Sequence, residues 1–231
     1  PGVVAIYLTG SLPAGCGPHD VAIALVGKLF KSGYVKNKVM EFVGPGIASL
    51  RQDTRNAIDA MTTETTCLSS IWETDETTHR FLAVHGRAAD YKKLAPADLA
   101  YYDGVVEVDL SAIRPMIALP MHPSNAFTIE ELNANLEDIL HACEQDVQKL
   151  IGRKDISLDL CSKIENGKLR VDQGVIAGCA GGLYDSIYEA ASILKGHTGG
   201  CGDYALSVYP VCLLIMIPPV RTRVPYNTLS R

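Results

Sequence analysis

The chain has 231 residues, of which 47% are hydrophobic and 20% are charged, a composition typical of a folded globular protein and not of a disordered or fibrous one. At this length it holds one full domain, or one domain and part of another. The formal net charge of −5 comes from 21 basic and 26 acidic residues mixed along the chain, so no basic stripe is present and we expect no nucleic-acid partner.

Short β-branched runs, Gly/Pro turns and amphipathic stretches alternate along the first half of the chain. This order is typical of βαβ units around a buried parallel sheet, so the sequence predicts an α/β fold. The predicted strands are residues 3–8, 39–43, 65–72 and 105–110. The predicted helices are residues 18–32, 51–61 and 74–85, and Thr74 is the expected cap of the third.

Residues 119–125 form the strongest linker signal, because Pro120 and Pro123 stand there among polar neighbours. We therefore expect one α/β domain over residues 1–118 and a partial second α/β domain over residues 119–231. Apolar residues recur every three or four positions over residues 129–151, which predicts one long helix. The other predicted elements are strands at 156–160 and 168–171 with a turn at Asn166-Gly167, strands at 175–177 and 205–208, and a helix at 183–194.

A turn of small residues, Gly178-Cys179-Ala180-Gly181-Gly182, lies between a predicted strand and a predicted helix. A helix start of this kind leaves backbone N–H groups free and favours the thiolate form of Cys179, as a nucleophile or a metal ligand needs. The alternative is a buried structural cysteine beneath a closely packed turn. A phosphate-binding loop is disfavoured, because the Lys and Ser/Thr that follow the glycines of such loops are missing.

Glu64 is the one acid in the hydroxyl-rich run Thr62-Thr63-Glu64-Thr65-Thr66. It is either a solvated turn residue or a carboxylate that orients a histidine, as in hydro-lyase and metal sites. Among the six histidines, His122 is the least typical of a surface residue, because it stands beside Pro120 and Pro123. A purely structural role for His122 is the alternative.

The chain has seven cysteines, an odd number, and none of them forms a C-x-x-C pair. In a chain large enough to fold without disulfide bonds, this indicates free thiols in a reducing compartment, so we expect a cytoplasmic protein. The longest apolar run, residues 211–217, is closed by prolines and is shorter than the roughly 20 residues that cross a bilayer, so we expect no membrane segment.

Several short motifs follow one another in a fixed order along the chain. They are Leu8-Thr9-Gly10-Ser11-Leu12-Pro13, Pro18-His19-Asp20-Val21, Met40-Glu41-Phe42-Val43-Gly44-Pro45-Gly46-Ile47, the stretch from Met61 to Glu64, and Gly178-Cys179 before Tyr184-Asp185. In this order they resemble the middle of the aconitase family, which includes aconitases and isopropylmalate dehydratase large subunits. The resemblance covers residues 3–120 well and residues 174–209 moderately, and the shared order makes it specific.

The resemblance implies an α/β fold like the aconitase iron–sulfur domain, with mostly parallel sheets flanked by helices, incomplete relative to the family. It implies a hydro-lyase that dehydrates and rehydrates a hydroxy di- or tricarboxylic acid at a [4Fe-4S] cluster. Three cysteines hold such a cluster, and its open iron acts as a Lewis acid. Cys179 matches the first cluster cysteine, a metal and cofactor ligand, and Glu64 matches the catalytic-site glutamate that hydrogen-bonds a histidine.

The sequence also departs from the family pattern. Ala60 stands where the family commonly has an asparagine, and Gly181 lies among small residues that replace polar neighbours of the cluster cysteine. The family's upstream Asp-Ser-His segment, its later C-x-x-C pair and its swivelling domain have no counterpart in the chain. We therefore expect an internal fragment. Its expected partners are a small hydroxy acid and these missing segments of the same protein. We expect the full-length protein to hold the cluster, and the chain alone to bind no cluster and to be inactive.

Two alternatives remain open on the sequence alone. The first is a non-catalytic α/β binding or structural domain that keeps only the fold, which Ala60 and the glycine-rich turn favour. The second is a thiolate nucleophile at Cys179, although no histidine can be placed beside it from the sequence.

Overall fold

The computed structural model describes residues 1–195 and 205–208 of the chain. The chain divides into two compact units, Pro1–Ile129 and Glu130–Arg231. The sequence places its domain boundary between residues 118 and 119, inside the first of these units. We describe each unit by itself.

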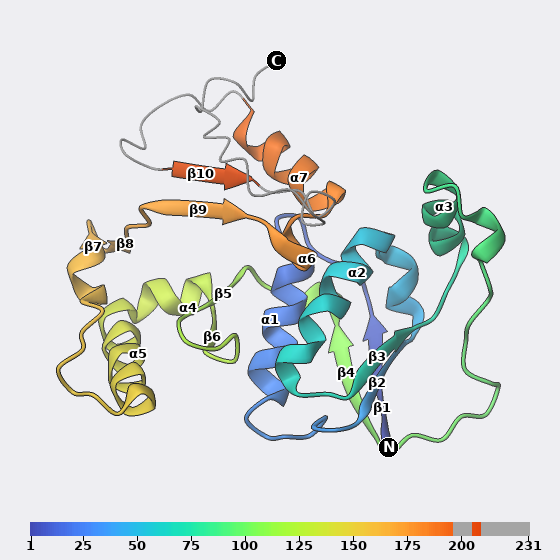
Figure 1. Ribbon diagram of the computed structural model, residues 1–231, viewed down its shortest axis with the longest axis horizontal. Helices are drawn as coiled ribbons and strands as arrows, with labels where there is room; N and C mark the ends of the chain where they lie inside the picture. The colour runs from blue at the N-terminus through green and yellow to red at the C-terminus, as the bar shows by residue number, and fades with distance from the viewer. Residues whose placement is uncertain (196–204, 209–231) are drawn as a thin grey trace. The chain divides into compact units, whose positions relative to one another are not determined.

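A four-stranded parallel sheet lies at the centre of the first unit, with the strand order β3-β2-β1-β4 (Figure 1). Its strands are β1 (Val3–Thr9), β2 (Val39–Val43), β3 (Ser69–Trp72) and β4 (Gly104–Asp109). In the register of the sheet, Ala5 pairs with Glu41 on one side and with Val105 on the other. The structure thus confirms the predicted α/β fold.

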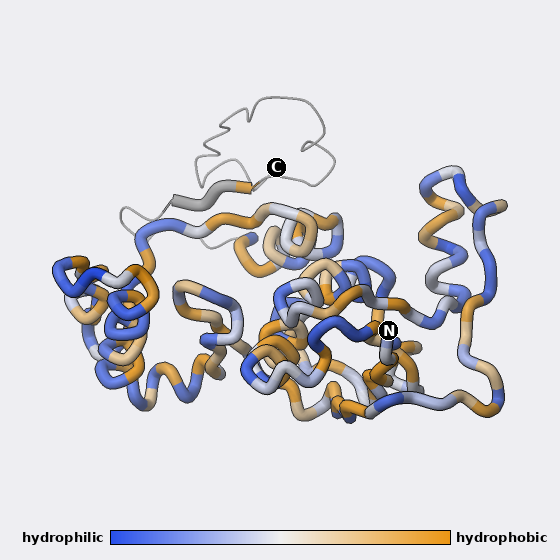
Figure 2. Tube along the Cα trace, turned by 60° about the horizontal axis from the view of Figure 1, so that its bottom comes forward, coloured by the Kyte–Doolittle hydropathy of each residue, from blue (hydrophilic) through white to orange (hydrophobic). Residues whose placement is uncertain are grey.

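One face of the sheet packs against α1 (Pro18–Leu29) and α2 (Gln52–Met61). The buried side chains come from alternate strand positions and from one stripe of each helix, as the periods of the two structures require. The core cluster consists of Val4, Ile6, Leu8, Val21, Leu25, Leu29, Val35, Met40, Phe42, Ile47, Leu50, Ile58, Leu110 and Ile113. Figure 2 shows hydrophobic residues concentrated in the elements around this sheet.

The start of α1 follows from its sequence. Pro18 occupies the first turn, where its fixed φ suits the helix and its missing N–H is no loss. The Asp20 carboxylate accepts a hydrogen bond from the Gly17 N–H at 2.7 Å, and its other oxygen accepts one from the Met116 N–H at 2.6 Å. Asp20 therefore both caps α1 and fixes the chain that follows β4.

Short 3-10 turns follow three of the strands and helices: η1 (Pro45–Ser49), η2 (Thr62–Thr65) and η4 (Leu110–Ala112). The prediction of a strand over residues 65–72 is wrong in its first part, because β3 begins only at Ser69. The hydroxyl of Thr65 donates to the Thr62 carbonyl at 2.7 Å, and Thr66 has a left-handed φ of 62°. These local bonds hold the turn, and β-branched residues there do not extend into a strand.

The connection from β3 to β4 contains α3 (Glu76–Val84) and η3 (Ala88–Asp90). The N-cap of α3 is Asp75 and not the predicted Thr74, since the Asp75 carboxylate accepts hydrogen bonds from the N–H groups of Thr77 and Thr78. A carboxylate is favoured there over a hydroxyl by the positive end of the helix. No residue of α3 is buried.

Arg55 is the largest fully buried polar side chain of the first unit, with 1% of it exposed. It donates to both oxygens of Asp75, at 2.6 and 3.1 Å, and to the carbonyls of Ile47 and Leu50, at 3.0 and 3.2 Å. A buried guanidinium is stable only when its donors are satisfied in this way. The Arg55–Asp75 pair links α2 to the start of α3, and the bonds to the two carbonyls link α2 to the turn after β2.

We expect the contribution of Asp75 to stability to depend on pH. Burial alone raises its pKa, but hydrogen bonds from Arg55 and from the N–H groups of Thr78 and Thr77 outweigh burial and hold the pKa below its ordinary value of 3.8. A carboxylate with a lowered folded-state pKa stabilises the fold above its unfolded pKa, and this contribution is lost as pH falls through the folded pKa.

Urea unfolding of the wild type and of Asp75→Asn at several pH values checks this expectation. Asparagine keeps the cap and removes the charge, so the wild type is expected to be the more stable at pH 7, and the difference should shrink as pH falls below about 4. A difference that stayed constant down to pH 2.5 would contradict it.

An antiparallel hairpin, β5 (Met116–Ala118) and β6 (Ala126–Thr128), completes the first unit. Residues 119–125, the segment with the linker signal, connect the two strands of this hairpin. The hairpin lies close against α1, since a Cβ atom on Gly27 would come within 2.8 Å of the Ala126 side chain. Only glycine lets the two backbones approach in this way.

The second unit holds helices α4 (Ile129–Ala134, which begins at the last residue of the first unit) and α5 (Leu136–Ile151) in place of the one predicted helix. The break falls at Asn135, whose φ of −134° and ψ of 40° are not helical. The apolar stripe of α5 buries Leu136, Leu140, Cys143 and Val147.

The remaining elements are η5 (Leu160–Lys163), β7 (Ile164–Glu165), β8 (Lys168–Leu169), β9 (Gln173–Ile176), α6 (Gly178–Gly181), α7 (Tyr184–Leu194) and β10 (Ala205–Val208). The turn predicted at Asn166-Gly167 is confirmed, since both residues have a positive φ and join β7 to β8. The strand predicted over residues 156–160 is wrong. Strands β9 and β10 pair in parallel.

Within residues 1–195 and 205–208, none of the helices combines the length and the apolar character that crossing a bilayer requires.

Candidate functional site

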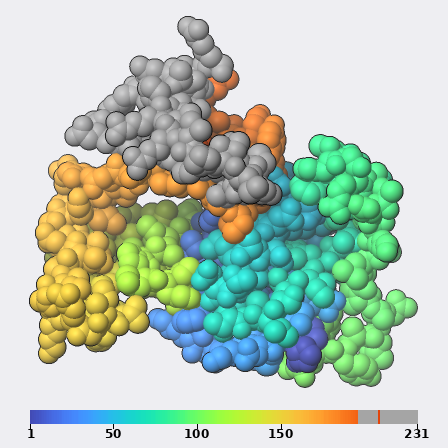
Figure 3. Space-filling model, viewed as in Figure 1, coloured from blue at the N-terminus to red at the C-terminus, as the bar shows by residue number. Residues whose placement is uncertain are grey.

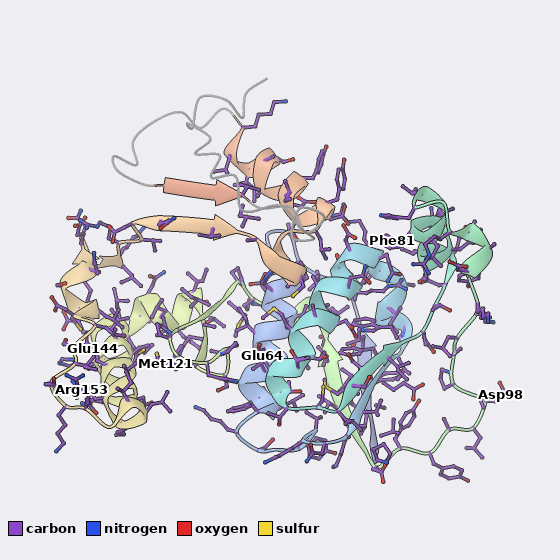
Figure 4. All side chains as sticks on the ribbon, viewed as in Figure 1. Glu64, Phe81, Asp98, Met121, Glu144 and Arg153 are labelled. Carbon is purple, nitrogen blue, oxygen red and sulfur yellow. The ribbon has the colours of Figure 1, made fainter. Side chains whose placement is uncertain are left out.

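Glu64 lies in η2, directly before β3, and so at the amino end of the parallel sheet. The carbonyl of Thr66 accepts a hydrogen bond at 3.0 Å from the N–H of Asn37, which precedes β2, and this fixes η2 against the neighbouring strand. Figure 4 labels Glu64 beside the lower ends of α1 and α2. Its side chain is 45% exposed, so it can meet a ligand or a neighbouring group.

The structure brings Glu64 together with His122, the histidine that the sequence singles out. The Oε2 atom of Glu64 lies 3.7 Å from Nε2 of His122, and 35% of the histidine side chain is exposed. This separation is longer than a direct hydrogen bond, so the carboxylate acts on the ring by charge. The interpretation of Glu64 as a carboxylate beside a histidine therefore has a geometric basis.

The surroundings of His122 fix the orientation of its ring. The ring stacks on Phe30, which follows α1, with 4.0 Å between the centroids. The Ser124 N–H donates to Nδ1 at 3.1 Å, and the Ser124 hydroxyl lies 3.0 Å from the same atom. Since Nδ1 accepts, the proton of the neutral ring lies on Nε2, the nitrogen that faces Glu64.

Phe30 and Ser124 are functional candidates that the sequence reasoning missed. Ser124 is two residues from His122, and a serine at that distance is a common local partner of a preceding side chain. Phe30 carries no such signal, because it meets His122 only through the packing of the hairpin on α1.

Cys179 lies in α6, a single helical turn that follows β9. Gly178 has a φ of +80°, a left-handed conformation that favours glycine, and it turns the chain so that Cys179 is exposed. The alternative of a buried structural cysteine is therefore wrong, and the buried residue of the turn is Ala180. An exposed thiol at this position is free to bind metal or to react.

An iron–sulfur cluster of the aconitase type needs three thiolates. Within the described part of the chain, no group of three His, Cys, Asp or Glu side chains is arranged to hold a metal ion. Cys201 and Cys212 lie outside that part. The described residues alone do not fit a complete cluster, and among their cysteines the exposed thiol is that of Cys179. Glu64 belongs to the first unit and Cys179 to the second.

A second candidate edge lies at the carboxyl ends of β1 and β4, where the strand order reverses and ligands commonly bind in open α/β sheets. Gly10 has a φ of +66° there, and a Cβ atom on it would come within 2.7 Å of the Asp109 carboxylate. Hydrogen bonds from the Ser111 hydroxyl and N–H lower the pKa of Asp109. The Asp109 carboxylate at this edge is thus bonded to the neighbouring residue Ser111, through both its side chain and its backbone.

We expect the thiol of Cys179 to react with Ellman's reagent in the folded protein, whereas Cys143, which is 3% exposed, should react only after unfolding. Mass spectrometry of a short labelling time course identifies which thiols react. The Cys179→Ser variant should lose one fast-reacting thiol, and Cys143→Ser should lose none. Slow labelling of Cys179 in the folded protein would contradict the exposed turn.

Comparison with known proteins places these residues in a family. Residues 1–212 match the aconitase family, described as aconitate hydratase. The 2,3-dimethylmalate dehydratase large subunit of Eubacterium barkeri is 28% identical over 196 residues, which are 85% of this chain and 38% of that protein. The 3-isopropylmalate dehydratase large subunit 2 of Archaeoglobus fulgidus is 31% identical over 192 residues, 83% of this chain and 38% of that protein.

A 3-isopropylmalate dehydratase large subunit from Lachnoclostridium phytofermentans is 26% identical over 220 residues, which are 95% of this chain and 44% of that protein. The chain therefore spans about two fifths of the length of these relatives. The family match covers most of the chain and includes both Glu64 and Cys179. The chain belongs to the aconitase family.

Proposed function

We propose that this chain is part of a hydro-lyase that removes water from, and adds it back to, a hydroxy di- or tricarboxylic acid. The observation that carries the proposal is the exposure of Cys179 on a tight turn, in a chain that belongs to the aconitase family. Relatives are named dehydratases of 2,3-dimethylmalate and 3-isopropylmalate, and both names describe substituted hydroxy dicarboxylic acids.

In this proposal Cys179 is one of three thiolate ligands of a [4Fe-4S] cluster, and the other two come from residues outside the described part of the protein. Such a cluster supplies Lewis-acid activation of the substrate hydroxyl. Exposure of Cys179 supports this role, because a ligand that is shared with other segments must be reachable.

We assign Glu64 a positioning role through His122. The carboxylate faces Nε2, the nitrogen that carries the proton of the neutral ring, and keeps the proton there. The stack on Phe30 and the bonds from Ser124 restrict rotation of the ring. A histidine held in this way is suited to give or take a proton at the departing hydroxyl or at the carbon-bound proton.

The partners follow from the same relatives. Their names describe large subunits, so we propose that the complete protein works with a second, smaller subunit in the cytoplasm. Residues 1–231 alone are expected to be inactive, because they span only about two fifths of the length of the dehydratases that they resemble.

A dehydration assay tests the proposal. The protein expressed from its complete reading frame, with its partner subunit and anaerobic iron loading, should convert isopropylmalate, dimethylmalate or citrate to an unsaturated acid with increased ultraviolet absorbance. Cys179→Ser should abolish this turnover, and Cys161→Ser, in the same unit, should leave it unchanged. Equal turnover of Cys179→Ser and the wild type, or no turnover with any hydroxy acid, would contradict the proposal.

A non-catalytic domain that keeps only the fold is the second candidate. It is favoured by Ala60, which lies on α2 one turn before Glu64 and offers no polar group to a cluster or a substrate. The same assay separates the two, since this candidate predicts no turnover and no effect of any Cys179 variant.

A further inference from the structure

The second face of the four-stranded sheet is covered only in part, at Ala5 and Val43, and we call it the open face. Its residues alternate with the core residues of each strand. One row across the sheet runs Ile71, Glu41, Ala5 and Val105 in register. The next row contains Val43, Tyr7 and Glu107. Tyr7, Ile71 and Val105 are 41%, 42% and 55% exposed.

Open parallel sheets are normally covered on both faces. Helices α1 and α2 cover the first face, and right-handed crossovers then place the return connection from β3 to β4 on the second. That connection covers the open face poorly. Helix α3 buries no residue, and residues 91–103, which we call the arm, leave Leu94, Leu99 and Tyr101 exposed.

Figure 1 shows the arm as a long loop on the side of the sheet opposite α1. Figure 3 shows α3 standing out from the rest of the first unit. The arm is tied down near its two ends, where the Thr74 N–H donates to the Leu94 carbonyl at 2.9 Å and the Asp103 N–H donates to the Val3 carbonyl at 2.8 Å. Apolar side chains are thus exposed both on the open face and on the arm.

The open face is also acidic. Glu41 and Glu107 lie on it, and Glu73 follows β3 beside them, whereas no strand residue on this face is basic. Burial, with the charges of Glu41 and Asp75, raises the pKa of Glu73, although Arg55 opposes this. Burial and the charge of Glu41 likewise raise the pKa of Tyr102, at the end of the arm. Crowded carboxylates of this kind are relieved by a basic neighbour.

We propose that the open face is a docking surface for a helix with an apolar stripe and flanking Lys or Arg residues, contributed by a part of the same protein outside residues 1–231. The curated relatives support this source, because the chain covers only 38% and 44% of their lengths. A second copy of the chain is disfavoured, since it would bring the same carboxylates face to face. The proposal does not depend on the hydro-lyase chemistry.

Photo-crosslinking of the protein from its complete reading frame tests the occupant. With Val105 replaced by p-benzoylphenylalanine, the cross-linked peptide should come from outside residues 1–231 and carry Lys or Arg. The same replacement at Val84, which is 86% exposed on α3, is the control and should not give this peptide. Cross-links to residues 76–103, to an isotope-labelled second copy or to another protein, or no cross-link, would overturn the proposal.

Thermal unfolding of the same protein gives an independent measurement. Val105→Arg should lower Tm by roughly 5 °C or more, because the longer side chain would prevent the apolar stripe of the docked helix from packing on the sheet at this position. Val84→Arg should change Tm by about 1 °C or less, as expected at an exposed position. Equal Tm values for the two variants would show that the open face faces solvent and would overturn the proposal. Neither variant touches Glu64 or Cys179, so loss of hydratase activity is a separate result.

Discussion

Replacement of Arg55 by methionine is expected to lower the free energy of unfolding by about 3 kcal/mol, near the lower end of the range for breaking buried ion pairs because Asp75 is partly exposed. The substitution keeps an unbranched side chain, shorter than that of arginine, and removes all its donors. It leaves the carbonyls of Ile47 and Leu50 and the Asp75 carboxylate without the bonds that Arg55 makes to them. Urea denaturation followed by circular dichroism measures the change.

Arg80→Met is the matched control, since Arg80 is an exposed residue of α3 in the same unit. Its effect is expected to stay within about 0.5 kcal/mol. Equal midpoints for the two variants would contradict the role of Arg55 as a buried link between α2 and α3. A double variant with Asp75→Asn should lose less than the sum of the two single effects, because the two residues share one interaction.

In the active enzyme, Glu64→Gln is expected to lower kcat about 10–100-fold, the range for losing a carboxylate that orients a histidine. KM should change little, because Glu64 acts on His122 and not on the substrate in this account. Glu130→Gln, at an exposed position of α4, should leave kcat unchanged. Steady-state kinetics on the purified enzyme supply both values.

Because Glu64 lies beside His122, a double variant of the two residues tests whether they act together. His122→Gln should cause a similar loss, and the double variant should be little worse than either single one. Additive losses would indicate that Glu64 acts independently of His122 and only supports the fold.

The parallel sheet could be predicted from the sequence because its strands are buried on at least one face. Val3–Thr9 and Val39–Val43 are β-branched runs closed by glycines, and each is followed by an amphipathic helix. The single helix expected over residues 129–151 was a wrong prediction for a physical reason. Leu132 and Leu136 keep helical spacing across Asn135, so periodicity alone does not show the break.

Residues of the candidate site could be singled out from the sequence, but their geometry could not. Glu64 and His122 stand 58 positions apart in the sequence numbering, and only the hairpin packed on α1 brings them within 3.7 Å. The sequence does not indicate that Arg55 is buried either, because a basic residue in an amphipathic helix is usually exposed. Its partner Asp75 lies on another element, and such long-range pairs follow from packing.

Iron and sulfide analysis shows whether Cys179 binds an iron–sulfur cluster. The protein from its complete reading frame is loaded anaerobically with iron and sulfide, and its metal content and visible absorption are compared with those of Cys179→Ser and Cys161→Ser. We expect about four irons per chain in the wild type and in Cys161→Ser, and a large loss of iron in Cys179→Ser. Equal iron content in all three proteins, or none in the wild type, would contradict it.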